Sequence, residues 1–346
     1  IGNIDPYRIS NDGQLFFTSR DAQSNLYVAD FNDKKGISNP QPVGKYDVKE
    51  YIWSSDSKCI AYVSSISATY GFSGVEEPPF QYIDIHALDK NGGKITINNH
   101  DFPQSDHLLS WHPSEAAILI HRFGRIGQGS IIKYSLVGGK IEPILTPPPN
   151  QSMEEGGIKF SDCVLNKNND IMYYQKSVRR EYEFDEGHGR GEYNQEYLIQ
   201  RNIKSGEEKV LFGGYFGYWG RITLSPDEKW VSLFGMEGEK YDPNLNALRV
   251  INTITGEKRE LYKSWISLIG WSLDSQSLIA QRGANFLRIS LEGGEPVEIF
   301  NIGNKYLGDA ALSPDGTKIA FILSRPKYEG LWVIENFLPK EIAQGE

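Results

Sequence analysis

Residues 312–335 read LSPDGTKIAFILSRPKYEGLWVIE, and this stretch decides the fold. A turn of Ser, Pro, Asp and Gly is followed by an apolar segment, KIAFIL. A polar break separates that segment from another, LWVIE, which is rich in the β-branched and aromatic residues that favour a pleated, half-buried surface. The stretch therefore predicts short antiparallel strands joined by tight connections.

Seven segments of the chain repeat this pattern. Their turn positions recur every 41 to 60 residues, a spacing that suits a unit of four short strands. These positions are Asp12, Asp56, Ser114, Lys167, Asp227, Asp274 and Asp315. Seven such sheets arranged radially leave only short, protected edges. The repeats therefore predict an all-β fold, a seven-bladed β-propeller of four-stranded antiparallel blades.

The repeats also predict where each blade begins and ends within one domain spanning residues 1–346. The expected blades are residues 8–46, 50–104, 107–150, 157–213, 219–263, 265–303 and 306–346. The fourth repeat is degenerate, because KNND stands at 167–170 where the others have a turn similar to SPDG. A count of six blades is therefore the alternative.

The stretch at 312–335 resembles the PD40 repeat of TolB-like propellers, and so do LSPDEKWVSLFG from Leu224 and WSSDSKCIAYVSS from Trp53. The likeness spans nearly the whole chain. It implies the propeller fold and favours a periplasmic, cell-surface or secreted bacterial protein. Since the sequence shows neither an initiating Met nor a signal peptide, a propeller domain of a larger protein is a further alternative.

Composition narrows the classes of partner. The net charge of -9 argues against nucleic acid and anionic membranes, because phosphate binding needs clustered Lys and Arg. No apolar run approaches the roughly 18 residues of a membrane-spanning helix, so no membrane insertion is expected. Only Cys59 and Cys163 are present, which excludes a disulfide framework. We expect a soluble monomer.

Long insertions are predicted on one face of the ring. In a four-stranded meander, the connections from second to third strand share a face with the links between blades, and three of those connections are long. They lie at 66–81, 177–196 and 236–246. Binding residues concentrate in long loops on a rigid scaffold. The short, regular turns lie on the opposite face, where Asp and Ser are expected to cap their own backbone and not to bind metal.

The predicted binding site combines these insertions with the aromatic link GGYFGYWGR at 213–221. Aromatic side chains offer flat apolar surface at low entropic cost, and charged side chains beside them would add polar contacts. The candidate ligand-binding residues are Tyr215, Phe216, Tyr218, Trp219, Arg179, Arg180, His188, Arg190, Tyr70, Phe72, Tyr241 and Arg122. The alternative without a ligand is that the aromatic residues only pack between one blade and the next, and that the charged insertion is a solvated loop.

Arg122 belongs to a further pattern of basic residues at the end of the second strand. The five are Arg20, Arg122, Lys176, Arg282 and Arg325. They predict either an anion-binding ring around the channel or pairing between neighbouring blades.

The sequence shows no catalytic motif. GxSxG and GxxxxGK[ST] are both absent, and six histidines fall without metal-ligand spacing. We therefore expect no catalytic residue, no metal and no cofactor, and favour a non-catalytic propeller that binds a protein, peptide or glycan. The enzyme alternative is a polysaccharide-active propeller similar to oligogalacturonate lyases, which use a His-rich metal site. His107 and His121 are the residues that such a site would recruit.

Overall fold

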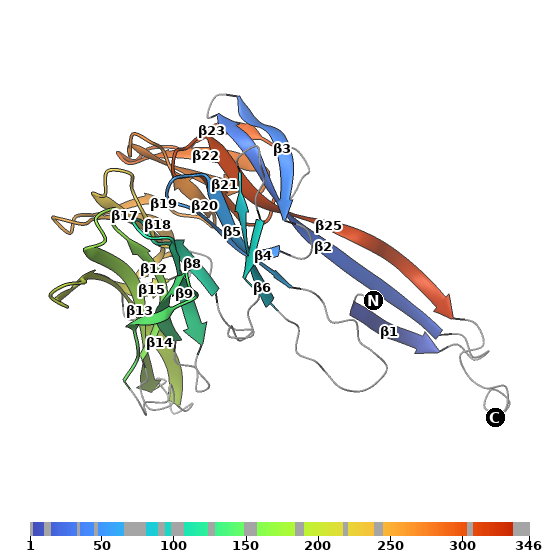
Figure 1. Cartoon of the computed structure of the whole chain (residues 1–346), viewed down its shortest axis with the longest axis horizontal. Coiled ribbons are helices and arrows are strands. Elements are labelled where there is room, and N and C mark those ends of the chain that lie inside the picture. Colours follow the sequence, from blue (N-terminus) through green and yellow to red (C-terminus); the bar gives the residue numbers. More distant parts are fainter. Residues whose placement is uncertain are drawn as a thin grey trace.

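The computed structural model describes residues 3–9, 15–32, 35–44, 48–65, 81–88, 94–97, 107–123, 129–148, 158–183, 190–216, 221–238, 245–302 and 307–334. Within these ranges the chain forms antiparallel β-strands and no α-helix, which confirms the all-β class (Figure 1). No helix there is long and apolar enough to cross a membrane.

Five units of four strands follow one another along the chain, and we call them blades I to V. Blade I contains β4 (Val48–Trp53), β5 (Cys59–Ser65), β6 (Gln81–Ala87) and β7 (Lys94–Ile97). Blade II contains β8 (His107–Trp111), β9 (Ala117–Phe123), β10 (Gly129–Ser135) and β11 (Ile141–Leu145). Each strand pairs antiparallel with the next, as expected for a meander.

Blades III and IV form one continuous sheet, because β15 pairs with β17. Blade III contains β12 (Ile158–Leu165), β13 (Ile171–Glu183), β14 (Arg190–Asn202) and β15 (Glu208–Phe216). Blade IV contains β16 (Thr223–Leu224), β17 (Trp230–Glu237), β18 (Ala247–Asn252) and β19 (Lys258–Tyr262). Blade V contains β20 (Ser267–Trp271), β21 (Ser277–Arg282), β22 (Asn285–Ser290) and β23 (Val297–Asn301).

Blade VI joins the two ends of the described chain. Its inner strands are β24 (Ala310–Leu312) and β25 (Lys318–Ile334), and its outer strands are β2 (Leu15–Asn32) and β3 (Gly36–Gly44). The long strands β2 and β25 pair from Asp30↔Lys318 to Leu15↔Ile334 and continue beyond the blade as a ribbon, with β1 (Asn3–Ile9) on the edge of β2 (Figure 1).

The predicted count of seven blades is not confirmed. Strands of the expected first blade (8–46) and last blade (306–346) pair with each other in one sheet, so the described strands make six four-stranded units. The physical reason is that β2 and β25 each run straight through the place where the repeat predicts a turn back. Their backbone groups then find partners on each other, which satisfies them as well as a hairpin would.

Six apolar clusters hold the blades together, one at each junction. Ile52 and Ile118 pack between blades I and II, and Phe160 and Leu119 between blades III and II. Further clusters lie between III and IV, IV and V, and V and VI. The sixth joins Tyr51 of blade I to Ala320 of blade VI and therefore closes the ring.

In four blades the connection between the first and second strands is the same hydrogen-bonded turn. In blade I the Ser54 hydroxyl donates to Asp56 Oδ1 at 2.7 Å and accepts from the N–H of Cys59 at 2.8 Å. The same contacts recur at Ser225 with Asp227, Ser272 with Asp274, and Ser313 with Asp315. The Asp and Ser residues thus cap their own turns, as expected from the sequence.

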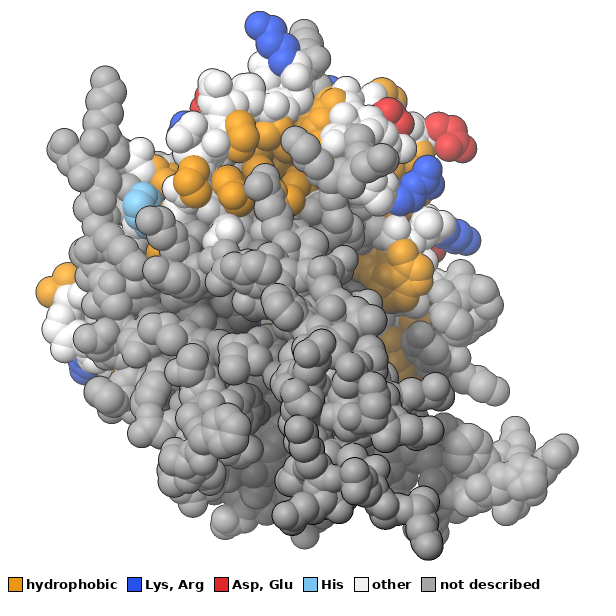
Figure 2. Space-filling model, turned by 90° about the vertical axis from the view of Figure 1, so that its right-hand side faces the viewer, with side chains coloured by type: hydrophobic (Ala, Val, Ile, Leu, Met, Phe, Trp, Pro, Cys, Tyr) orange, Lys and Arg blue, Asp and Glu red, His pale blue; other side chains and the backbone are white. Residues whose placement is uncertain are grey.

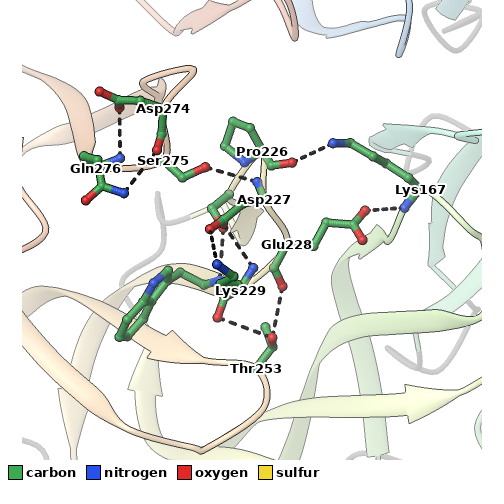
Figure 3. A network of polar contacts seen from close by, with 11 residues as sticks. Lys167, Pro226, Asp227, Glu228, Lys229, Thr253, Asp274, Ser275 and Gln276 are labelled. Atoms are coloured by element: carbon green, nitrogen blue, oxygen red, sulfur yellow. Dashed lines mark hydrogen bonds and ion pairs between the residues drawn. The ribbon is translucent and has the colours of Figure 1, made fainter.

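Turns of neighbouring blades also bond to one another, as Figure 3 shows for blades III, IV and V. The N–H of Asp227 donates to the Ser275 hydroxyl at 3.0 Å, and the Lys167 ammonium donates to the Pro226 carbonyl at 2.6 Å. The N–H of Asp315 donates to the Ser57 hydroxyl at 3.0 Å across the junction of blades VI and I. This face of the ring, the turn face, uses its polar groups for structure.

One position of the turn requires a left-handed backbone. It is occupied by Ser57, Asn169, Glu228, Ser275 and Gly316, with φ between 57° and 66°. At Gly316 an added Cβ would also lie 2.9 Å from Leu273 Cγ. Only glycine adopts this conformation without a steric cost.

We therefore expect Gly316→Ala to lower the free energy of unfolding by about 1–2 kcal/mol. Gly316→Asn should lose less, because Asn tolerates the left-handed region better. Urea denaturation of the three proteins checks this order. Equal stability of the alanine variant and the parent would contradict the assignment of the turn.

Exposed apolar side chains occur on several parts of the described surface. On the face drawn in Figure 2, hydrophobic side chains gather in the upper part of the view beside charged ones. Other exposed apolar residues, such as Val137 and Ile254, stand in connections between the third and fourth strands. Isolated exposures of this kind are normal for a soluble surface and indicate no site.

Candidate binding face and channel

The innermost strand of each blade begins on the face opposite the turns, which we call the loop face. The connections from second to third strand and the links between blades lie there too, because strand direction alternates. Aligned on their turns, the blades place a titratable residue four positions before the turn Ser or its equivalent in four cases. These residues are Glu50, Asp162, Arg221 and Asp309, and we call them the channel cluster.

Arg221 spans the centre of the ring. Its guanidinium donates to the Tyr51 carbonyl of blade I at 3.2 Å and to Asp309 Oδ2 of blade VI at 3.1 Å. Arg221 itself precedes β16 in blade IV, which lies opposite blade I in a ring of six. Its side chain is 40% exposed and that of Asp309 46%, so the pair remains open to solvent or to a ligand.

Asp162 is the most perturbed carboxyl of the cluster. Its Oδ2 accepts the N–H of Ile222, which ties blade III to blade IV. Burial raises its pKa to about 6, although this hydrogen bond and the nearby Arg221 act in the opposite direction. A carboxyl with such a pKa changes its charge close to neutral pH.

Glu50 ties blade I to blade II in the same way. One oxygen contacts His107 Nδ1, and the other accepts the N–H of Leu108 at 2.8 Å. The ring of His107 lies parallel to that of His121, with 6.3 Å between the centroids. Burial lowers the pKa of His121 to about 3, so this imidazole is neutral at physiological pH.

A second buried polar group supports the junction of blades III and IV. Glu196 accepts from the N–H of Phe216, from Gln175 Nε2 at 2.9 Å and from the Ser177 hydroxyl at 3.2 Å. Burial raises the pKa of Glu196 and lowers that of Lys159, and the two attract each other. These groups are satisfied within the protein and position β15.

Two of the predicted ligand-binding residues are described with their side chains on the expected aromatic link. Phe216 packs edge-on against Phe212, with centroids 5.6 Å apart, and adds to the cluster between blades III and IV. Tyr215 is half-buried, and its backbone pairs with Met236 of β17. Phe216 therefore packs between the blades, as the alternative prediction for this link has it, and its role in binding stays a prediction.

The predicted insertion at 177–196 is largely strand. β13 and β14 pair continuously out to Glu183↔Arg190, so Arg179, Arg180 and Arg190 lie on a long hairpin and not in an open loop. Pairing along both strands satisfies the backbone there. The side chains of these three arginines lie outside what the structure describes, as do the residues Tyr70, Phe72, His188, Tyr218, Trp219 and Tyr241. Their role in binding stays a prediction.

The basic residues at the ends of the second strands do not act alike. Arg282 of blade V donates to the Tyr262 hydroxyl of blade IV at 2.6 Å, which is pairing between neighbouring blades. Arg122 is half-buried near the end of β9. The side chains of Arg20 and Arg325 lie outside what the structure describes, so the anion-binding ring stays a prediction.

Trp265, which lies on the link between blades IV and V, was not predicted as a site residue from the sequence. Its indole is 57% exposed and packs against Phe234, with 5.2 Å between the rings. The sequence also did not predict the channel cluster, because its four members differ in residue type. They are Glu50, Asp162, Arg221 and Asp309. Only the alignment of repeats on their turns would have placed them in one layer.

Within the described ranges, no group of three or more His, Cys, Asp or Glu side chains is arranged to hold a metal ion. His107, His121 and Glu50 converge, as the enzyme alternative requires, but they do not form such a group.

Comparison with known proteins identifies the fold. No family model matches the sequence, and no curated protein matches it. Among solved structures, a putative TolB from Agrobacterium tumefaciens is similar over 88% of this chain and 99% of that one, with a TM-score of 0.53 and 13% identity. The fold is a TolB-like β-propeller.

A chain of a nidogen/laminin complex is similar over 87% of this chain and 98% of that one, with a TM-score of 0.51 and 7% identity. TolB from Acinetobacter baumannii matches at 16% identity and a TM-score of 0.48, and the match covers 65% of its length. Identities this low concern the fold alone, and membership of the PD40 repeat family stays a prediction.

The raised pKa of Asp162 predicts how stability depends on pH. The folded protein binds this proton more tightly than the unfolded chain, whose carboxyl has a pKa near 3.8. Stability contributed by this group therefore rises as the pH falls from 7 through 6 toward 4. Asp162→Asn should remove that rise and stabilise the protein at pH 7 by on the order of 2 kcal/mol.

Urea denaturation of the parent and the Asp162→Asn variant at pH 7 and pH 5 measures the effect. The difference in unfolding free energy between the two proteins should shrink at the lower pH. An equal difference at both values would show that Asp162 does not titrate in this window.

Proposed function

We propose that the protein is a non-catalytic TolB-like propeller that binds a protein or peptide on its loop face, at the mouth of the channel. The observation that carries the proposal is the Arg221–Asp309 pair, which is half-exposed at the centre of that face. Support also comes from the nidogen/laminin structure, in which a chain of similar fold belongs to a protein complex.

The two faces differ in what they offer a partner. On the turn face, Ser and Asp side chains bond to their own turns and turns bond to the next blade. On the loop face, Arg221 and Asp309 present a cation and an anion side by side, which suits the alternating donors and acceptors of a peptide. A partner that displaces water from this pair gains charge-assisted hydrogen bonds.

Trp265 supplies the apolar part of the proposed site. Its indole is more than half exposed and packs against Phe234, which restrains its orientation. Trp is among the residues that dominate binding energy in interfaces. Leu245, also exposed, borders the same blade on the loop face. The predicted aromatic and arginine residues of blades III and IV would extend this surface.

Selection of peptides from a random displayed library on the immobilised protein tests the proposal. We expect selected peptides to lose affinity at least tenfold with Trp265→Ala and with Asp309→Asn, since each removes a central contact. Ile254→Ala, which truncates an even more exposed apolar residue on the turn face, should bind as the parent does.

Peptides that bind all three variants equally would place the site elsewhere. Glycan-array binding lost in the same variants would keep the site but change the ligand class to carbohydrate. A periplasmic, cell-surface or secreted location and a monomeric state accompany this proposal as predictions, which fractionation and sedimentation would check.

A second candidate, an enzyme acting on polysaccharide, is favoured by one observation, the convergence of His107, His121 and Glu50. Metal analysis of the purified protein discriminates the two functions. We expect less than one equivalent of any transition metal or calcium. A stoichiometric metal that is lost in His107→Ala would support the enzyme and overturn the binding function.

A further inference from the structure

The strands β2 and β25 each contain two strands of the sequence repeat. β2 joins LFFTS, which follows the turn at Asp12, to LYVAD, the third strand of the same repeat. β25 likewise joins KIAFIL to LWVI. Elsewhere in the ring these two strands fold back on each other, as β17 and β18 do. The first and last repeats have instead exchanged partners.

The register differs between the two halves of this pairing. In blade IV, Val231 pairs with Ile251. The part of β2 and β25 that lies within blade VI has the same register, because the equivalent residues Ile319 and Ala29 also pair. In the ribbon, the residues at the positions of Val231 and Ile251 are Phe16 and Ile334. These two do not pair, because Phe16 pairs with Val333, one residue earlier. A slip of one residue turns each side chain to the other face of the sheet. The ribbon therefore departs from the pairing seen in blade IV.

The two halves meet at an irregularity. The register shifts between Asp21 and Ala22, where Asp21 pairs with Tyr328 and Ala22 with Pro326. Proline donates no hydrogen bond to a ladder and is found at edges and bulges. This point also coincides in both strands with the connection between second and third strands of the repeat, so it is a natural place to fold back.

The ribbon leads away from the ring (Figure 1), although the sequence at its outer end is apolar. LFF at 15–17 and LWVI at 331–334 have the composition of buried strands in the other repeats. In the described part of the chain, β1 is the one further strand that pairs with this end of β2. A strand of this composition gains free energy when neighbouring sheets cover it.

We propose that the structure is one of two arrangements of the same ring. In the other, β2 and β25 fold back at 21–24 and 324–328, so that residues 8–46 and 306–346 form separate blades and the ring contains seven. The exchange needs no new sequence, because the seven repeats already specify these hairpins.

Such a change acts on the channel. In the ring of six, the Tyr51 hydroxyl donates to the Ala320 carbonyl at 2.8 Å, and Trp53 Nε1 donates to the Ala311 carbonyl at 3.1 Å, so blade I touches blade VI. A seventh blade between them separates these groups. Arg221, which holds both Tyr51 and Asp309, then loses one partner, and the channel cluster opens.

Distance measurement between spin labels at Thr18→Cys and Asp30→Cys tests the exchange. These residues stand twelve positions apart on one straight strand, which places them about 40 Å apart. In the folded-back arrangement they lie in adjacent strands, and the labels approach to within about 20 Å. Cys59→Ala serves as the background, and Cys163 is buried. We expect both distances in one sample.

Two variants move the balance. Ala22→Asn with Gln23→Gly favours a tight hairpin turn and should raise the short-distance fraction, whereas Gln23→Val favours continuous strand and should lower it. Dilution with unlabelled protein separates exchange within one chain from exchange between two copies, which would produce a dimer and overturn the proposal. A single distance, long or short, that neither variant alters would overturn it as well.

Discussion

The pairing of β2 with β25 is the constraint on which this ring of six blades depends, because it joins the first described strands to the last. An open row of blades would leave the sheets of its two end blades uncovered on one side, together with their apolar residues. Leu26 and Val28 instead enter the same cluster as Tyr51 and Ala320, and the junction of blades VI and I is as apolar as the other five. Each blade can then be short, since its neighbours supply the rest of its core.

The closed ring divides the polar groups between its two faces. On the turn face, Ser and Asp side chains form the hydrogen bonds of their own turns. In blade I the hydrogen bond from the Ser54 hydroxyl lowers the pKa of Asp56. Among the described residues of the loop face no such motif recurs, and the residues at the beginnings of the innermost strands differ in type. Glu50 and Asp162 accept hydrogen bonds from the backbone of the next blade. Arg221 and Asp309 are the half-exposed pair that the proposed partner would contact. Uniformity on one face and variety on the other is the physical basis for placing binding on the loop face.

The sequence predicted the elements whose signal is local. The turn at Asp227, the strand pair that follows it and the all-β class need only the pattern of a single repeat. What the sequence left open depends on contacts between repeats. Nothing local distinguishes a third strand that folds back from one that pairs with the opposite end of the chain, so the blade count was not fixed by LSPDG alone. Arg221 carried no signal, because its partners Tyr51 and Asp309 lie far away in the chain.

The ring of six blades requires the first and last repeats to share a sheet. Oxidation of a double variant, Asp30→Cys with Lys318→Cys, measures this directly, since the two residues are backbone partners in blade VI and now form an ion pair at 3.5 Å. Directly paired strands bring Cα atoms within the range that a disulfide requires. We predict an intramolecular disulfide between residues 30 and 318 in the folded protein, identified by peptide mass spectrometry. Two free thiols in a protein that remains folded would contradict the shared blade.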